Sequence, residues 1–92
     1  MLTHIVFWQL KPGAKEENAL QIKERLEALV GVIPGLLEMR VGRNVIAGEY
    51  DLALVSRFES EEALHAYEQH PEHQKIRVFV RSVITARAAV DF

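Results

Sequence analysis

The first predicted strand is apolar on both of its faces, which restricts the folds that the chain can adopt. Residues 3–10, THIVFWQL, are rich in β-branched and aromatic residues and therefore predict a strand. Side chains alternate between the two faces of a strand. The two sets are Ile5 and Phe7 on one face and Val6, Trp8 and Leu10 on the other. Helices can cover only one face, so the other needs a partner, and we assign Val6, Trp8 and Leu10 to an interface with a second copy of the chain.

The composition leads to the same expectation. The chain has 92 residues, and we expect a single domain over residues 1–92. A domain of this size buries only roughly 60–65% of the surface that its unfolded form exposes. Yet 49% of the residues are apolar and no cysteine is present to cross-link them. This surplus of apolar side chains predicts a homodimer in which two sheets pack face to face.

The charge and the hydropathy pattern argue against several classes of protein. The formal net charge is −2, and basic and acidic residues are interspersed, so no basic surface is expected to attract nucleic acid. No apolar run approaches the length of a membrane span, and the first residues do not resemble a secretion signal. The absence of cysteine fits a reducing compartment. We therefore expect a cytoplasmic protein that binds neither nucleic acid nor membranes.

The spacing of apolar residues predicts elements in the order β-α-β-β-α-β. The predicted strands are residues 3–10, 36–45, 50–58 and 85–92, and the predicted helical stretches are residues 14–32, 61–70 and 73–83. The last two stretches form one helix that Pro71 interrupts. Within residues 36–45, alternation predicts that Leu37, Met39 and Val41 share one face, opposite Glu38 and Arg40. This order is typical of the ferredoxin-like α+β fold, an antiparallel sheet with its helices on one face.

The segment YEQHPEHQK, residues 67–75, contains the candidate chemical groups. Tyr67 and His70 are three residues apart and share one side of a continuous helix. His73 lies beyond Pro71, so its distance from Tyr67 depends on how the helix is broken. Histidine has an ordinary pKa near 6.5 and can act as a base, whereas a neutral phenol can donate a hydrogen bond to a carbonyl.

The same segment is open to two other interpretations. His73 can instead bond a backbone carbonyl and organise the break at Pro71. His70 and His73 can also suggest a metal site, but zinc needs three or four ligands, the chain has no cysteine, and Glu72 is the one nearby carboxylate of note. We therefore expect no metal and no cofactor, and we place His70 in the cavity or on its rim.

The sequence resembles the stress-responsive dimeric α/β-barrel (Dabb) family along nearly its whole length. The segments that carry the resemblance are HIVFWQLK at 4–11, IPGLLEMRVGRN at 33–44, YDLALVSRFESEEALHAYEQHPEHQ at 50–74 and the terminal AVDF. The run YEQHPEH is the most specific of them. The resemblance implies a ferredoxin-like protomer, a homodimer built sheet against sheet, and a cavity between the sheet and its helices. Some members are linked to stress responses.

The resemblance also implies roles for particular residues. One plant branch of the family cyclises a linear polyketide by aldol chemistry, and its tyrosine and histidine fall on Tyr67 and His73, with an assisting histidine at His4. A further cavity histidine of that branch falls on Leu52, where this chain is aliphatic. On the first strand His4 shares a face with Val6 and Trp8, so it lies either at the dimer interface or in the cavity, and the resemblance favours the cavity.

Two functions remain open at this point. The first is a stress-related homodimer with a small-molecule cavity of unknown ligand. The second is a protein that binds or converts an apolar, carbonyl-bearing small molecule. As a cofactor-free enzyme it would be either an aldol-type cyclase or lyase that uses Tyr67 and His73 or a monooxygenase, because the fold alone does not choose between these chemistries.

Overall fold

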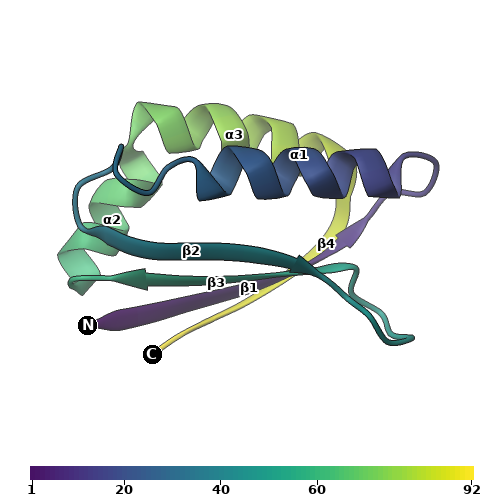
Figure 1. The fold of residues 1–92 in the computed structure, drawn as a ribbon, viewed down its shortest axis with the longest axis horizontal. Helices are drawn as coiled ribbons and strands as arrows, with labels where there is room; N and C mark the ends of the chain where they lie inside the picture. The colour runs from purple at the N-terminus through teal and green to yellow at the C-terminus, as the bar shows by residue number, and fades with distance from the viewer.

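Three helices cover one face of a four-stranded antiparallel sheet (Figure 1). The computed structural model describes residues 1–92. The elements are β1 (Leu2–Leu10), α1 (Lys15–Glu27), β2 (Leu36–Arg43), β3 (Leu52–Phe58), α2 (Glu61–Gln69), α3 (Pro71–Val83) and β4 (Ile84–Asp91). The strand order is β2-β3-β1-β4, and each neighbouring pair is antiparallel. This arrangement confirms the predicted ferredoxin-like α+β fold.

The predicted break at Pro71 separates α2 from α3 by a single residue. His70 has an extended backbone (φ −66°, ψ 133°), and its Nδ1 accepts a hydrogen bond from the backbone N–H of Glu72 at 3.1 Å. Pro71 is the first residue of α3, a position where no helical partner exists for the N–H that proline lacks. Because His70 caps it, α3 begins at Pro71 and not at His73 as predicted.

The central strand β1 turns its even-numbered side chains toward the helices. Val6, Trp8 and Leu10 are 1%, 5% and 2% exposed and belong to the core between the sheet and the helices. The prediction that these three residues form the interface with a second copy is therefore wrong. Both faces of β1 are apolar, and the helices cover the one that carries the tryptophan because this removes more apolar surface from water.

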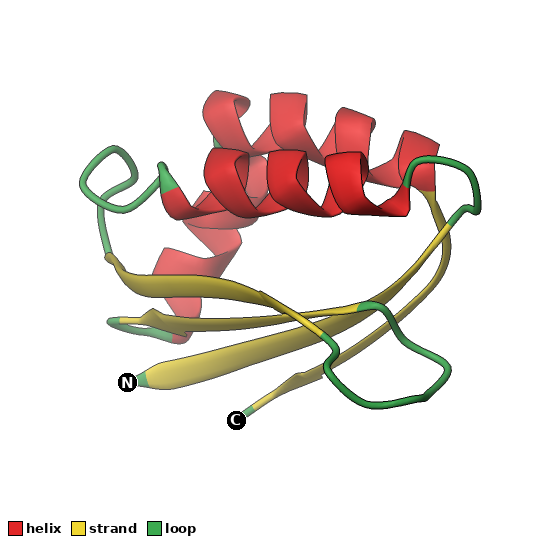
Figure 2. Ribbon diagram, turned by 45° about the vertical axis from the view of Figure 1, so that its right-hand side comes forward, coloured by secondary structure: helices red, strands yellow, loops and turns green.

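The opposite face of the sheet is apolar at its centre and bare of helices (Figure 2). Its apolar side chains, called the open face below, are Ile5, Phe7, Ala53, Val55, Ala88 and Val90, which pair across β3, β1 and β4. Phe7, Val55 and Val90 are 43%, 38% and 62% exposed. One apolar face of β1 is thus left uncovered, as predicted, but it is the face with Ile5 and Phe7.

A bulge in β2 changes the alternation that was predicted for this strand. The pairing of β2 with β3 shifts register between Leu36 and Glu38. Leu36, Met39 and Val41 are buried, whereas Leu37 is exposed. Leu37 therefore does not share a face with Met39 and Val41, although the alternation predicts that it does. A bulge adds one residue to one strand of a pair, so the residues on its two sides no longer follow a single alternation.

The first helix is shorter than its apolar spacing predicts. It ends at Glu27, and residues 28–33 form turns in which Gly31 has a φ of 86°. This left-handed backbone angle favours glycine and is not helical. Leu29 and Ile33 are nevertheless buried, which explains why their spacing continues that of the helix. None of the three helices has both the length and the apolar character that a membrane span requires.

Replacing Trp8 tests its position in the core. Trp8→Ala is expected to lower the free energy of unfolding by about 3–5 kcal/mol, because it leaves a cavity at a buried aromatic position. Trp8 is the only tryptophan, so urea denaturation is best followed by circular dichroism. Val78→Ala is the control, since Val78 is 71% exposed on α3 and its loss should change stability by no more than about 0.5 kcal/mol. Equal effects of the two substitutions would contradict this assignment.

Candidate functional site

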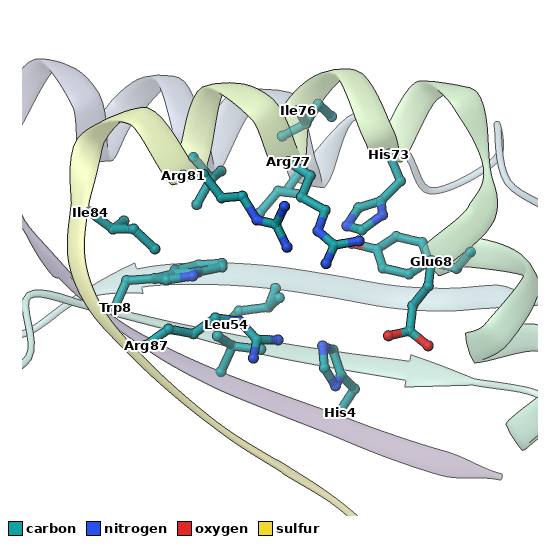
Figure 3. Close-up of a pocket in the computed structure, with 14 residues that line it drawn as sticks. His4, Trp8, Leu54, Glu68, His73, Ile76, Arg77, Arg81, Ile84 and Arg87 are labelled. Atoms are coloured by element: carbon teal, nitrogen blue, oxygen red, sulfur yellow. The ribbon is translucent and has the colours of Figure 1, made fainter.

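A cavity lies between the helix-facing side of the sheet and the helices (Figure 3). Its volume is ≈ 230 Å³. A cavity of about 150 Å³ can hold benzene, so this one has room for a substituted ring. Much of its wall is apolar and comprises Val6 and Trp8 of β1, Leu54 of β3, and Ile76 and Val80 of α3. The polar residues of the lining come from β1, α2, α3 and β4.

His4 enters the cavity from β1 and is held by a carboxylate on the neighbouring strand. The His4 side chain is almost wholly buried, and its Nδ1 forms a hydrogen bond with the carboxylate of Asp91, its pairing partner on β4. An ionised carboxylate only accepts hydrogen bonds, so Nδ1 carries the proton in this pair. When the ring is neutral, Nε2 is its acceptor nitrogen.

Tyr67 and His73 lie in contact although a helix break separates them in sequence. Their ring centroids are 4.1 Å apart, with an angle of 32° between the ring planes. Phe58 of β3 packs edge-on against Tyr67 at 5.0 Å and fixes its ring from the other side. The residue His70 turns the chain between α2 and α3, so the first turn of α3 carries His73 over the end of α2.

Burial keeps both of these groups neutral. Tyr67 is 2% exposed, and burial raises the pKa of its phenol well above the ordinary value of 10.0. The site therefore holds a protonated phenol that can donate a hydrogen bond. Burial also lowers the pKa of His73 below 6.5. The backbone of Glu68 acts in the opposite direction, and the charge of Arg77 acts in the same direction as burial. Nδ1 of His73 is buried without a hydrogen-bond partner.

Three arginines complete the polar part of the lining, and the sequence analysis did not identify them. Arg77 and Arg81 come from α3 and Arg87 from β4, and all three extend toward the cavity (Figure 3). A signal was present in the sequence, because His73, Arg77 and Arg81 follow one another at four-residue intervals and so share one side of a helix. The place of Arg87 depends on the pairing of β1 with β4, which no local pattern reveals.

The remaining candidates lie elsewhere. His70 does not line the cavity, because its Nδ1 is engaged in capping α3. Leu52 is buried in the core and does not line the cavity either. No group of three histidine or carboxylate side chains lies close enough together to hold a metal ion. Thus His4, Tyr67 and His73 meet at one cavity, as the resemblance implied. The prediction that His70 lies in the cavity or on its rim is wrong, because His70 is not part of the lining.

The comparisons with known proteins agree with this fold. A family model described as the stress responsive A/B barrel domain matches residues 2–92. A dimeric protein of unknown function with a ferredoxin-like fold from Bacteroides fragilis has a TM-score of 0.91 and 29% identity, over 99% of this chain and 93% of that chain. A dimeric ferredoxin-like protein of unknown function from Thermobifida fusca has a TM-score of 0.86 and 27% identity, over 99% and 88%.

A more distant structure shares the fold alone. The hydroxynitrile lyase from Passiflora edulis has a TM-score of 0.87 but only 18% identity, over 99% of this chain and 90% of that chain. No curated protein sequence matches the chain.

His73→Gln is expected to weaken the dependence of stability on pH. The pKa of His73 is near 6.5 in the unfolded chain and lower in the folded protein, so on acidification the unfolded chain takes up the proton first. The contribution of neutral His73 to stability is complete above about pH 6.5 and is lost as the pH falls through that value toward the lower folded pKa. The wild type should lose up to about 1.4 kcal/mol per pH unit more than the variant in this range.

The measurement is urea denaturation between about pH 7 and about pH 5, the range in which histidines titrate. His65→Gln serves as the control, because His65 is exposed on α2 and its loss should leave the pH dependence unchanged. If His73→Gln and the wild type show the same pH dependence, His73 is not a buried neutral base.

Proposed function

The chain belongs to the stress-responsive A/B barrel domain (Dabb) family, and on this basis we propose that it is a homodimer whose protomers each bind a carbonyl-bearing small molecule and remove a proton next to that carbonyl. The observation that carries the proposal is the meeting of His4, Tyr67 and His73 at one cavity. Because the family is described as stress responsive, we also propose that the protein takes part in a stress response. The proposed assembly and the proposed chemistry use opposite faces of the same sheet.

The open face supports the homodimer. Its apolar side chains form a continuous patch across three strands, and such patches on small domains mark interaction surfaces. Two copies that bring their open faces together would bury the exposed rings of Phe7 and the aliphatic groups of Val55 and Val90. The Bacteroides fragilis and Thermobifida fusca structures, at 29% and 27% identity, are both described as dimeric. The helices stay outside, so each protomer keeps its own cavity.

The chemistry follows from the protonation states of Tyr67 and His73. A neutral His73 can accept a proton from the carbon next to a carbonyl. The enolate that results carries negative charge on its oxygen, and the phenol of Tyr67 can donate a hydrogen bond to that oxygen. Because the two rings are in contact, a substrate carbonyl and its neighbouring carbon can reach both groups at once. No further reactant is needed for this step.

His4 supplies a second basic nitrogen to the same space. Asp91 orients the ring, and His4 and His73 both line the cavity. We assign His4 an assisting role, in which it accepts or returns a proton on the side of the substrate away from His73. An aldol-type closure or cleavage needs such a second group at the alcohol oxygen.

A charge in the centre of the open face should dissociate the homodimer. Phe7→Glu places a carboxylate opposite Ala53 and Ala88, where burial without a partner is costly. Light scattering coupled to size-exclusion chromatography at micromolar concentration is expected to give twice the chain mass for the wild type and a lower mass for the variant. Val78→Glu, on the exposed side of α3, should leave the mass unchanged. A wild type with the mass of one chain contradicts the proposal.

Exchange of carbon-bound hydrogen tests the chemistry without knowledge of the natural substrate. The wild type is expected to accelerate the exchange of the methyl protons of acetophenone in D₂O, followed by NMR. His73→Gln should reduce the catalysed rate by about 100-fold or more, and Tyr67→Phe by about 100–1,000-fold. His65→Gln should retain the wild-type rate. The proposal fails if the wild type exchanges no faster than the buffer, or if the His65 and His73 variants are equally impaired.

A further inference from the structure

The mouth of the cavity is positively charged. Arg77 and Arg81 descend from α3 and Arg87 rises from β4, so their guanidinium groups approach the same space from opposite sides (Figure 3). Arg87 is the pairing partner of Trp8 across β1 and β4, which puts it on the helix-facing side of the sheet. All three residues are exposed, whereas Tyr67 is buried, so the guanidinium groups lie nearer to the solvent than the phenol does.

No carboxylate of the protein forms an ion pair with these three arginines. Glu68 is the only carboxylate of the cavity lining, and it forms no ion pair either. The nearby carboxylate of Asp91 is bound to His4. Since a guanidinium keeps its proton under all ordinary conditions, the three positive charges remain.

Three of the other four arginines of the chain have partners, and Arg40 has none. Arg43 and Arg57 form ion pairs with carboxylates, and Arg25 lies over the ring of Phe79 at 4.4 Å. Arginine is suited to holding oxyanions, because its planar fork donates two parallel hydrogen bonds to a carboxylate or a phosphate. Three of the four unpaired arginines thus gather around one cavity, while the fourth, Arg40, lies on β2 outside it.

We infer that the cavity binds an organic oxyanion, with Arg77, Arg81 and Arg87 holding a carboxylate or phosphate group at the mouth while the apolar body of the ligand enters toward Tyr67 and His73. This inference deepens the proposed function and rests on it for the orientation of the ligand. The composition of the cavity wall supports this inference, because the lining also includes the apolar side chains of Val6, Leu54 and Ile76. A ligand with an anion at one end and a carbonyl at the other satisfies both ends of the site.

Three related probes test this inference by isothermal titration calorimetry. They are 4-acetylbenzoate, its neutral methyl ester, and 4-acetylphenyl phosphate, which share one ring and one methyl ketone. The wild type is expected to bind at least one of the anions about tenfold or more tightly than the ester, because hydrogen bonds to charged groups are the stronger ones. The better anion identifies the oxyanion that the site prefers. Added salt should weaken binding of the anion and spare the ester.

Charge-removing substitutions locate the binding site. Arg77→Gln, Arg81→Gln and Arg87→Gln are each expected to weaken anion binding by about tenfold or more, and to change ester binding by less than about twofold. Arg40→Gln is the matched control: Arg40 is exposed on β2, outside the cavity lining, and its loss removes the same charge from the chain. Melting curves by circular dichroism establish that each variant is folded before it is titrated.

The outcomes separate this inference from the proposed function. Equal affinity for the ester and both anions, no binding of either anion by the wild type, or an equal loss on Arg40→Gln would each overturn the inference. If acetophenone exchanges but the anions show no preference, the proton-transfer function stands and the ligand class is wrong. If the anions bind through the three arginines but no probe exchanges hydrogen, the ligand class stands and the proposed chemistry is wrong.

Discussion

The alternation of side chains along β1 is the constraint on which both halves of this molecule depend. His4, Val6 and Trp8 face the helices and contribute to the cavity, whereas Ile5 and Phe7 lie on the open face. Adjacent residues of one strand thus serve different purposes, and a shift of β1 by a single residue would exchange them. β1 is paired on both sides, with β3 and with β4, and this double pairing holds the register. Cavity and open face exist only while that register is kept.

The second condition is the junction between α2 and α3. A continuous helix would separate Tyr67 from His73 by more than one and a half turns and point their side chains in different directions. The extended residue His70 and the N-terminal Pro71 redirect the chain instead, so that the two rings come into contact. His70 therefore contributes to the site without touching it. Its role is to cap the helix that carries His73, Arg77 and Arg81.

Much of this structure is encoded in local patterns. The order of strands and helices, the break at Pro71 and the two apolar faces of β1 follow from spacing and from proline and glycine chemistry. Which face of β1 the helices cover could not be predicted, because both sets of side chains are apolar and the choice depends on the packing of the whole chain. The bulge near Leu37 was missed for a similar reason, since it is a property of the pair of strands and not of one of them. The convergence of His4, Tyr67 and His73 was expected from the family resemblance alone, whereas Arg87 became visible only once β4 was placed beside β1.

The regular spacing of polar groups on α3 has a consequence for ligand size. An α-helix rises about 1.5 Å per residue, so residues four apart are spaced by about 6 Å along its axis and residues eight apart by about 12 Å. His73, Arg77 and Arg81 thus lie at regular intervals along one side of the cavity, with His73 at one end. In the inferred binding mode, a short acid would span only the interval from His73 to Arg77, whereas a longer acid would also reach Arg81. In the site that we propose, the spacing along this helix would favour ligands by the distance between their acidic group and their reactive carbon.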